Sequence, residues 1–318
     1  MSRAFRLALK AQEKLYSSGL LQTRRLNHPV LSVGNLTMGG TGKTPLVIFL
    51  AECLRAEGFR PVILSRGYRR RTRGVLIVGR GNGPIVDWRD SGDEPWLMAQ
   101  RLKHTAVVVG EDRHLAGRRA QEENLGDLFI LDDGFQHRRL HRDFDIVTID
   151  PTEWDAGEAL IPMGRWREPK SAIARADAAC IQGSGELQDP AVLPIPSFKV
   201  GLTVDGIFDH DNRPVDEADL RGSSIVAFAG IGKPDRFFTT LQILGLNLAK
   251  CVSFRDHHAF GGNELNAHGG DVRITTEKDA VRITDRTDFL TLRVSATILD
   301  FERLRDLIRA RLVRNAIR

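Results

Sequence analysis

The stretch VGNLTMGGTGKTPLVIFL, Val33–Leu50, decides the fold. It follows an apolar segment and joins a glycine-rich turn to a helical pattern, which is the setting of a phosphate-binding P-loop. In such a loop the backbone N–H groups and the dipole of the following helix hold phosphates. Thr37 stands where the G-x-x-x-x-G-K-[ST] pattern begins with glycine. A residue with negative φ fits there, so this departure weakens the motif without breaking it.

The chemistry of P-loops predicts a role for each residue of the turn. Lys43 is expected to reach the β- and γ-phosphates, and the Thr44 hydroxyl is expected to bind Mg²⁺. The glycines let the backbone approach the phosphates closely. The alternative is a glycine-rich turn that binds nothing. The predicted nucleotide-binding residues are Thr37, Met38, Gly39, Gly40, Thr41, Gly42, Lys43 and Thr44.

Short apolar segments alternate with helical stretches from about residue 30 to residue 182. Segments that are apolar throughout, with helices between them, predict an α/β fold of the P-loop NTPase type. Its sheet should be mostly parallel and covered by helices on both faces. The predicted strands are Val30–Val33, Arg60–Ser65, Thr105–Gly110, Leu128–Asp133, Phe144–Asp150 and Ala178–Gln182.

The composition shifts to Gly, Ser and Pro between Gly183 and Pro196, which predicts a boundary. A second, smaller α/β unit and a charged C-terminal helix follow. We expect a basic N-terminal helix over residues 1–26 and a P-loop domain over 27–195. A two-stranded linker is expected over 196–210, and the smaller C-terminal α/β domain over 211–318.

Composition narrows the possible partners. The chain has 318 residues, 42% of them hydrophobic, and a net charge of +5 supplied mostly by arginine. This favours an anionic partner such as a nucleotide, a nucleic acid, a phosphorylated lipid or an acidic membrane. Only 7% of residues are aromatic, which argues against a nucleic-acid-binding ATPase. The three cysteines form no C-x-x-C pair, so neither zinc nor disulfides are indicated.

The N-terminal segment has the pattern of a basic amphipathic helix. Arg3, Arg6, Lys10, Glu13 and Lys14 occupy one arc of the helical wheel. Such a helix either lies in a bilayer interface or packs on its own domain. No apolar run approaches the roughly 18 residues of a membrane span, and no signal peptide is recognisable. We therefore expect a protein of the cytoplasmic side. The apolar arc holds Phe5, Ala8, Leu9, Ala11, Leu15 and Tyr16.

Acidic residues occur at two places where chemistry is expected. LFILDDGFQH places Asp132 and Asp133 at a strand end, as in a Walker B element that serves Mg²⁺. SGDEP places Asp93 and Glu94 at a helix start, where helix capping alone explains acidic residues.

Three further motifs carry basic residues or histidines. His257 in DHHAF can tune a carboxylate, or it can be a surface residue. Arg66 begins an arginine-rich stretch that grips a phosphate or is merely solvated. Glu168 lies in a proline-bounded loop, GRWREP.

These pieces occur together and in one order. The series is VGNLTMGGTGKTP, SRGY, SGDEP, LDDGFQH, REP, AGIGKPDRFF, DHHAF and TTEKDA, over about residues 28–284. It resembles the tetraacyldisaccharide 4′-kinase family, the lipid A 4′-kinases of Gram-negative envelope synthesis. The resemblance implies transfer of the γ-phosphate of ATP to the 4′-hydroxyl of tetraacyldisaccharide 1-phosphate, giving lipid IVA. It also implies a peripheral place on the inner face of the cytoplasmic membrane, with the N-terminal helix on the lipid surface.

The resemblance also implies roles for individual residues. Asp93 is the catalytic base and His257 pairs with it. Asp132, Asp133, Thr44 and Glu168 serve Mg²⁺. Arg66 and Glu94 are expected to contact the lipid substrate. ATP and the acylated disaccharide are then the partners, and nucleic acid is not.

A P-loop GTPase or ATPase regulator of the metallochaperone type is the alternative. A GTPase should carry an N/T-K-x-D motif that reads guanine. Here Lys278 and Asp279 are adjacent in TTEKDA, so the spacing does not match. A related ATPase class has a lysine before the paired glycines of the loop, where this chain has Met38.

Overall fold

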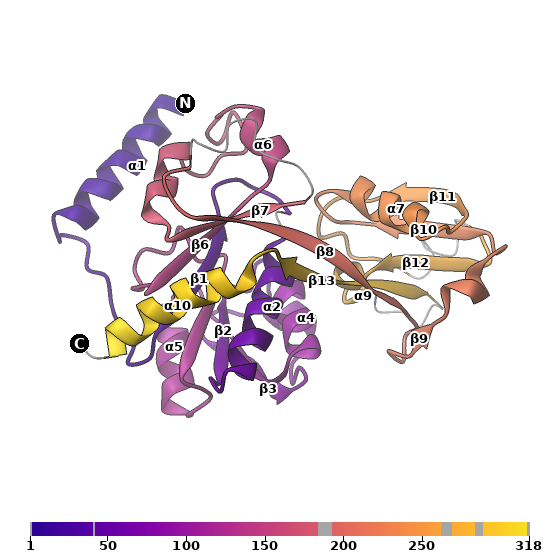
Figure 1. The fold of residues 1–318 in the computed structure, drawn as a ribbon, viewed down its shortest axis with the longest axis horizontal. Coiled ribbons are helices and arrows are strands. Elements are labelled where there is room, and N and C mark those ends of the chain that lie inside the picture. The colour runs from indigo at the N-terminus through magenta and orange to yellow at the C-terminus, as the bar shows by residue number, and fades with distance from the viewer. Residues whose placement is uncertain (1, 41, 184–192, 262–268, 284–288, 317–318) are drawn as a thin grey trace. The chain divides into compact units, whose positions relative to one another are not determined.

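The computed structural model describes residues 2–40, 42–183, 193–261, 269–283 and 289–316. The chain divides into two compact units (Figure 1). Unit 1 comprises Met1–Leu202 and Ala296–Arg318, and unit 2 comprises Thr203–Ser295. Two strands, β8 (Ser197–Phe208) and β13 (Leu290–Ile298), begin in one unit and end in the other.

Unit 1 is built on a mostly parallel sheet in the order β8-β7-β6-β1-β5-β2-β4-β3. The pairings among β1, β2, β4, β5, β6 and β7 and between β7 and β8 are parallel, and edge strand β3 is antiparallel to its neighbour β4. The predicted fold class is confirmed. The strands are β1 (Val30–Asn35), β2 (Pro61–Ser65), β3 (Leu76–Asn82), β4 (Lys103–Val109), β5 (Leu128–Asp132), β6 (Phe144–Ile149) and β7 (Ala178–Gln182).

Helices cover both faces of this sheet. On one face, α2 (Lys43–Ala56), α4 (Asp93–Arg101) and α10 (Phe301–Ala316) pack on alternate residues of the strands. On the other face, α5 (Arg113–Glu122) packs on the intervening residues. The remaining helical elements of unit 1 are α1 (Ser2–Ser17), α3 (Trp88–Ser91), α6 (Pro151–Asp155) and the 3₁₀ helix η1 (Lys170–Arg175). Strands buried on both faces explain the uninterrupted apolar segments of the sequence.

Two segments differ from the sequence expectation. Residues 296–318 belong to unit 1 rather than with 211–295, because Leu304, Ile308 and Leu312 lie one helical turn apart on α10 and are buried in the core of unit 1. The two strands expected over 196–210 are instead the single strand β8. Its glycines stay within the strand, and the antiparallel partner is β9 (Pro214–Val215), which pairs with Ile207 and Phe208.

Unit 2 is a smaller α/β unit. Strand β10 (Ile225–Ala229) pairs in parallel with β11 (Leu248–Ser253) and β12 (Val272–Thr276), and β12 pairs in parallel with β13. Helix α7 (Pro234–Ile243) buries Phe237, Phe238 and Leu241 against this sheet. The short elements η3 (Glu217–Leu220) and α9 (Glu277–Ala280) complete it. Among the described residues of the chain, no helix is both long enough and apolar enough to cross a bilayer.

Candidate active site

The P-loop joins the end of β1 to the start of α2. Gly39 has φ 124° and Gly42 has φ 66°, and both values favour glycine. Gly42 is the N-cap of α2, and no side chain among the described residues caps that helix end. The first N–H groups of α2 are thus directed at the turn, as anion binding requires. Lys43 and Thr44 are the first two residues of the helix, whereas Thr41 lies outside the described residues.

A second segment holds the entry of the P-loop. The N–H of Met38 donates to Arg165 O at 2.7 Å, and the N–H of Arg167 donates to Leu36 O at 2.7 Å. The Arg165 guanidinium donates to Met38 O at 2.6 Å. A Cβ on Gly39 would lie 2.1 Å from the same guanidinium, so a larger residue there would displace the Arg165 side chain. Residues 165–167 therefore pair with the loop as a short extra strand.

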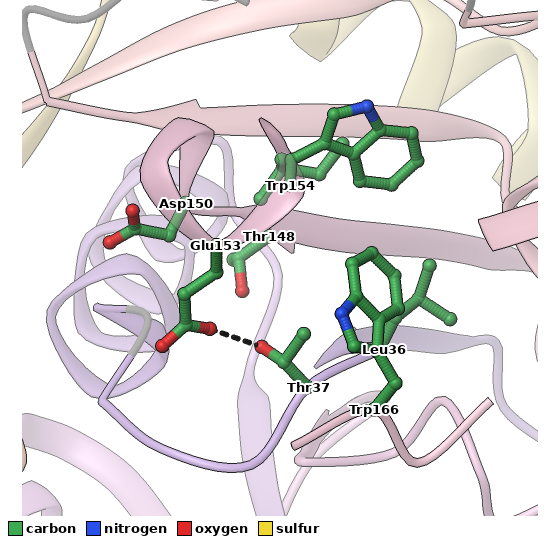
Figure 2. Close-up of a pocket in the computed structure, with 8 residues that line it drawn as sticks. Leu36, Thr37, Thr148, Asp150, Glu153, Trp154 and Trp166 are labelled. Carbon is green, nitrogen blue, oxygen red and sulfur yellow. Dashed lines mark hydrogen bonds between the residues drawn. The ribbon is translucent and has the colours of Figure 1, made fainter. Parts of the chain in front are cut away.

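The contacts of Thr37 show what this residue does at the position where the P-loop pattern has glycine. Its hydroxyl donates to Glu153 Oε2 at 2.7 Å (Figure 2). Glu153 also pairs with Arg165 at 3.4 Å. Trp154 and Trp166 line the small pocket beside this contact. The threonine thus fixes the loop to α6, a contact that glycine cannot make. We call the contacts among Thr37, Glu153 and Arg165 the P-loop latch.

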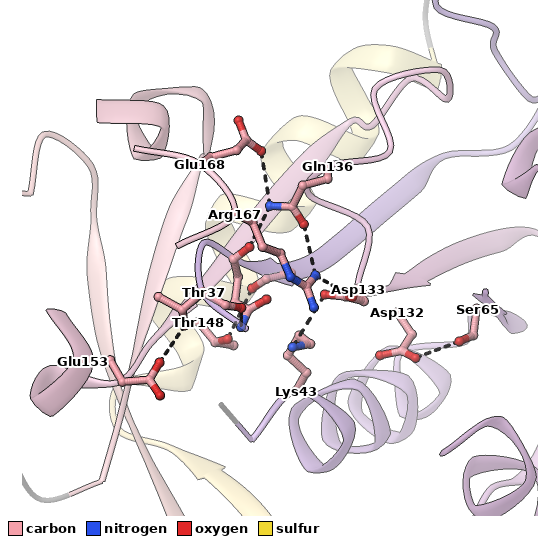
Figure 3. Close-up of polar contacts among 12 residues, drawn as sticks. Thr37, Lys43, Ser65, Asp132, Asp133, Gln136, Thr148, Glu153, Arg167 and Glu168 are labelled. Atoms are coloured by element: carbon pink, nitrogen blue, oxygen red, sulfur yellow. Dashed lines mark hydrogen bonds and ion pairs between the residues drawn. The ribbon is translucent and has the colours of Figure 1, made fainter. Parts of the chain in front are cut away.

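One side of the site is rich in cations. Asp133 Oδ1 lies 3.5 Å from Lys43 Nζ, and Asp133 Oδ2 accepts from Arg167 Nη1 at 2.7 Å (Figure 3). Burial raises the pKa of the Asp133 carboxyl, but Lys43 and Arg167 outweigh burial and the pKa is lowered overall. Gln136 accepts from Arg167 at 3.3 Å and donates to Asn35 O at 2.8 Å. This cation-rich side links the P-loop to the strand end of β5.

Glu168 belongs to the same side. Arg175 donates to its two oxygens at 2.7 and 3.1 Å, and Gln136 Nε2 donates to Oε1 at 3.2 Å. Fork-to-fork pairs of this kind are strong and directional. Arg175 and Gln136 therefore occupy part of the acceptor capacity of the Glu168 carboxylate.

The other side of the site is acidic. Asp132 ends β5, is 2% exposed, and accepts from Ser65 Oγ at 2.8 Å. Burial raises the pKa of Asp132 to about 7, and the negative charges of Glu94 and Asp133 add to that rise. Asp93 is the first residue of α4, is 5% exposed, and accepts from the N–H of Glu94 at 2.9 Å. Asp132, Ser65, Asp93 and Glu94 form what we call the acidic side.

Backbone contacts bring the SRGY and SGDEP loops together. The N–H of Arg71 donates to Arg89 O at 2.7 Å, and Thr72 Oγ1 donates to Asp90 O at 2.6 Å. A Cβ on Gly67 would lie 2.6 Å from Ser91 O, so the close approach depends on that glycine. Arg66 is exposed at the start of this loop. Its charge acts on the buried Arg113 of α5.

Arg113 is a residue that the sequence reasoning missed. It is 6% exposed, and burial lowers its pKa while the negative charges of Asp133 and Asp132 oppose that shift. The sequence does contain an indication that Arg113 lies at the site. Arg113 belongs to GEDRH, which directly follows β4, and the carboxyl ends of parallel strands meet at one edge of a sheet. Ser65, Gln136, Glu153, Arg165 and Arg175 were missed as well.

His257 lies in unit 2, in the loop after β11. Its backbone has φ 63°, and its N–H donates to Gly230 O at 3.1 Å. His257 Nε2 lies 3.9 Å from Asp256 Oδ1, and Lys278 Nζ lies 3.8 Å from the same oxygen. His258 stacks on Phe254 with ring centroids 4.7 Å apart, so it serves packing. The predicted pairing of His257 with Asp93 stays a prediction.

A magnesium ion fits the acidic side chemically. No group of three or more metal-ligating side chains is found among the described residues. Mg²⁺ with a nucleotide needs only one or two carboxylates, since phosphates and waters complete its shell. A buried carboxylate with a pKa raised to about 7 is the kind of group that a divalent cation stabilises in its charged form.

Comparison with known proteins decides the family. A family model described as tetraacyldisaccharide-1-P 4′-kinase matches residues 1–313. The chain belongs to this family. The expected family is confirmed, as is the expected kinase activity in lipid A biosynthesis, and the GTPase or metallochaperone alternative loses its support.

Relatives and a solved structure agree over nearly the whole length. The chain is similar to the tetraacyldisaccharide 4′-kinase of Aquifex aeolicus, with 36% identity over 92% of this chain and 91% of the relative. It is 40% identical to that of Geobacter metallireducens, over 89% and 87%. The crystal structure of the "apo" form of LpxK from Aquifex aeolicus in complex with ATP matches with a TM-score of 0.84. That match has 35% identity and covers 98% of this chain and 97% of the other.

Proposed function

We propose that this kinase transfers the γ-phosphate of ATP to the 4′-hydroxyl of an acylated glucosamine disaccharide 1-phosphate, with Asp93 accepting the hydroxyl proton. The observation that carries the proposal is the convergence of two chemically different sides on one sheet edge. Lys43 and Arg167 gather at Asp133, while Asp132 feels the charge of Glu94, the neighbour of Asp93. Phosphoryl transfer needs this combination of cations for the phosphates and carboxylates for the metal and the acceptor.

The nucleotide is assigned to the P-loop. Residues Thr37 to Thr44 hold the phosphates of ATP, with the backbone N–H groups at the start of α2 and Lys43 neutralising their charge. The Aquifex relative is described in complex with ATP, which supports ATP as the nucleotide here. Arg167 sits beside Lys43 on Asp133, so Asp133 holds two cations next to the proposed phosphate site.

Mg²⁺ is assigned to Asp132 and Thr44, and it neutralises the phosphate oxygens when bound. Asp133 and Glu168 hold cationic side chains, and we propose that they act on the metal indirectly by fixing Lys43, Arg167 and Gln136. This division of roles between adjacent carboxylates follows from their opposite pKa shifts.

Asp93 is assigned as the base. An ordinary Asp has a pKa of about 3.9 and is a weak base at neutral pH. In a loose transition state the proton leaves late, so a positioned carboxylate suffices, as in protein kinases. Asp93 is fixed by the N–H of Glu94 at the start of α4. His257 is proposed to pair with Asp93, and Arg66 and Glu94 to contact the lipid substrate.

The lipid substrate requires access to a membrane surface, and α1 is the proposed contact. Phe5 and Leu9 pack against the core of unit 1, and Arg6 pairs with Glu158 at 3.0 Å. Leu7 and Leu15 of α1, and Leu20 just after the helix, remain 66%, 40% and 75% exposed. Helix packing therefore uses part of the apolar arc. The exposed leucines, with Lys10 and Lys14, are proposed to lie in the headgroup region of the inner face of the cytoplasmic membrane.

Vesicle binding tests the membrane contact. The triple variant L7S/L15S/L20S should partition to anionic vesicles at least about tenfold more weakly. Burying one leucine side chain fully in an apolar environment contributes roughly 1.5–3 kcal/mol, and serine loses this contribution. L115S is the control, because Leu115 is 48% exposed on α5. Equal vesicle binding by the triple variant and the control contradicts the assignment of α1.

The activity is tested by transfer of ³²P from ATP to the disaccharide 1-phosphate lipid. We expect D93N to lower kcat by about 10³-fold, with KM for ATP changed by less than about threefold, because only the transition state uses the base. D87N is the matched control. Asp87 caps α3 by accepting from the N–H of Arg89 at 2.8 Å, and asparagine caps equally well. Near-normal turnover by D93N removes Asp93 from the mechanism.

A further inference from the structure

Gly230, at the end of β10 in unit 2, has both of its backbone polar groups engaged by distant residues. Its N–H donates to Asp279 Oδ2 at 3.1 Å. Its carbonyl accepts from the N–H of His257 at 3.1 Å and from Arg282 Nη2 at 3.1 Å. The three motifs AGIGKP, DHHAF and TTEKDA, which lie far apart in the sequence, therefore meet at one glycine.

The partners of Gly230 form a buried ion pair. Asp279 and Arg282 contact each other with side chains 0% and 1% exposed. Thr276 Oγ1 donates to Asp279 Oδ2 at 2.7 Å, which fixes the carboxylate further. A buried pair of this kind contributes little net stability compared with apolar side chains, because both charges leave water. The pair does fix the position of Gly230, because both of its members hydrogen-bond to the backbone of that residue.

The geometry in question is that of the His257 loop. His257 has φ 63°, a left-handed value that residues other than glycine rarely adopt and that persists only where neighbouring contacts impose it. The hydrogen bond from its N–H to Gly230 O is one such contact. The next residue, His258, is stacked on Phe254 and lies edge-on to Phe260 at 5.0 Å. The backbone on both sides of the His257 side chain is thus fixed.

We propose that Gly230, Asp279 and Arg282 are positioning residues that set the orientation of the His257 side chain for phosphoryl transfer. This inference rests on the proposed catalytic role of His257. The three residues act through the loop backbone, with the ion pair holding Gly230 and Gly230 holding His257. The competing view is that the buried pair only stabilises unit 2 and is indifferent to His257.

A methyl group at Gly230 separates these views. A Cβ there would lie 3.1 Å from Arg255 O, 3.3 Å from Asp279 Oδ1 and 3.3 Å from His258 Cβ, so the loop must shift by a few tenths of an ångström. We expect G230A to lower kcat about tenfold in the ³²P-transfer assay, because catalysis is sensitive to displacements of this size. KM for ATP should stay within about twofold, since the P-loop is in unit 1. G261A is the matched control, because a Cβ on Gly261 meets no atom of the described residues within 4 Å.

A double-mutant cycle with H257A identifies the route of the effect. If Gly230 acts through His257, adding G230A to H257A should change kcat by less than about twofold. An equal tenfold loss in both backgrounds overturns the inference while leaving the role of His257 intact. Unchanged kcat in G230A alone also overturns it. If H257A itself turns over near-normally, the proposed role of His257 fails and this inference fails with it.

R282K provides an independent arm of the same cycle. Arg282 Nη2 alone donates to both Asp279 Oδ1 and Gly230 O. Lysine keeps the buried positive charge, but its shorter side chain cannot place a nitrogen at the position of Nη2. R282K should lower kcat about tenfold in the native background and less than about twofold beside H257A. A loss that persists in the H257A background marks a purely structural role for Arg282. Thermal unfolding of each variant reports whether unit 2 remains folded.

Discussion

The two sides of the unit 1 site contain adjacent carboxylates with opposite properties. On the cation-rich side, Asp133 is held by Lys43 and Arg167 and its pKa is lowered. On the acidic side, Asp132 is buried beside further negative charge and its pKa is raised to about 7. Neighbouring residues of one motif, DDGFQH, thus have different surroundings, which is the basis of the proposal that Asp133 organises the cations and Asp132 binds the metal.

The largest effect is expected from removing the central cation. K43M should lower kcat/KM by about 10³-fold, because Lys43 neutralises the transferred phosphate in the transition state. Arg167 contacts the same carboxylate of Asp133 as Lys43 does, but we expect that Arg167 alone does not restore the activity. K103M is the control, since Lys103 is an exposed residue at the start of β4. A decrease in kcat/KM of less than about tenfold would show that Lys43 is not the main cation that neutralises the transferred phosphate.

The pH dependence of stability tests the acidic side. The pKa of Asp132 is higher in the folded protein, about 7, than its ordinary value of 3.8. The folded state therefore keeps this proton to higher pH than the unfolded chain does. The associated stability is fully present below about pH 4 and is lost as the pH rises through about 7.

Urea unfolding at pH 5 and pH 8, without metal or nucleotide, measures this effect. The free energy of unfolding of the native protein should fall relative to that of D132N as the pH rises, because asparagine does not titrate. The difference between the two proteins cancels the contributions of other titrating groups. A difference that is the same at both pH values means that Asp132 is ionised throughout and that the contrast with Asp133 is not one of charge state.

The P-loop latch should give a smaller effect. T37V removes the hydroxyl that donates to Glu153 and should raise KM for ATP about tenfold, because a hydrogen bond to a charged group is lost. The fluorescence of Trp154 and Trp166, which line the adjacent pocket, should report the loosened loop. If KM and fluorescence both match the native protein, the cation-rich side does not depend on the latch.

The smallest effect is expected from E153Q. Glutamine still accepts from Thr37 but loses the ion pair with Arg165, whose side chain is 57% exposed. Partly exposed ion pairs contribute little, so KM for ATP should change by less than about threefold. An E153Q effect as large as that of T37V would mean that charge, rather than the Thr37 hydrogen bond, holds the P-loop.

The sequence predicted the frame of the site well because local patterns encode it. The apolar segments and the glycine-rich turn predicted the parallel sheet and the start of α2, and the strand end of β5 predicted where Asp132 and Asp133 lie. The sequence also shows that Thr37 stands where the P-loop pattern has glycine, but it does not show which residue Thr37 contacts. Its partner, Glu153, is 116 residues away, and no periodicity connects the two.

Other features depended on tertiary contacts or on the family resemblance. Arg113 approaches the two aspartates only because β4 and β5 both flank β2. The roles of Asp93 and His257 came from the resemblance alone, since helix capping and a surface loop explain those residues equally well. Strand β8 was expected to be two strands, because its alternating pattern fixes the faces of a strand but not where the strand ends.

The proposal that Asp132, and not Asp133, binds the metal directly can be tested by measuring Mn²⁺ affinity. The affinity is measured by electron paramagnetic resonance for D132N and D133N in the presence of ATP. The proposed division of roles predicts that D132N weakens Mn²⁺ binding at least about 30-fold, because a direct carboxylate ligand is removed. D133N should weaken it by no more than about tenfold, because Asp133 holds Lys43 and Arg167 and acts on the metal only indirectly. The reverse order, or equal losses in the two variants, would contradict the assignment of the metal to the acidic side.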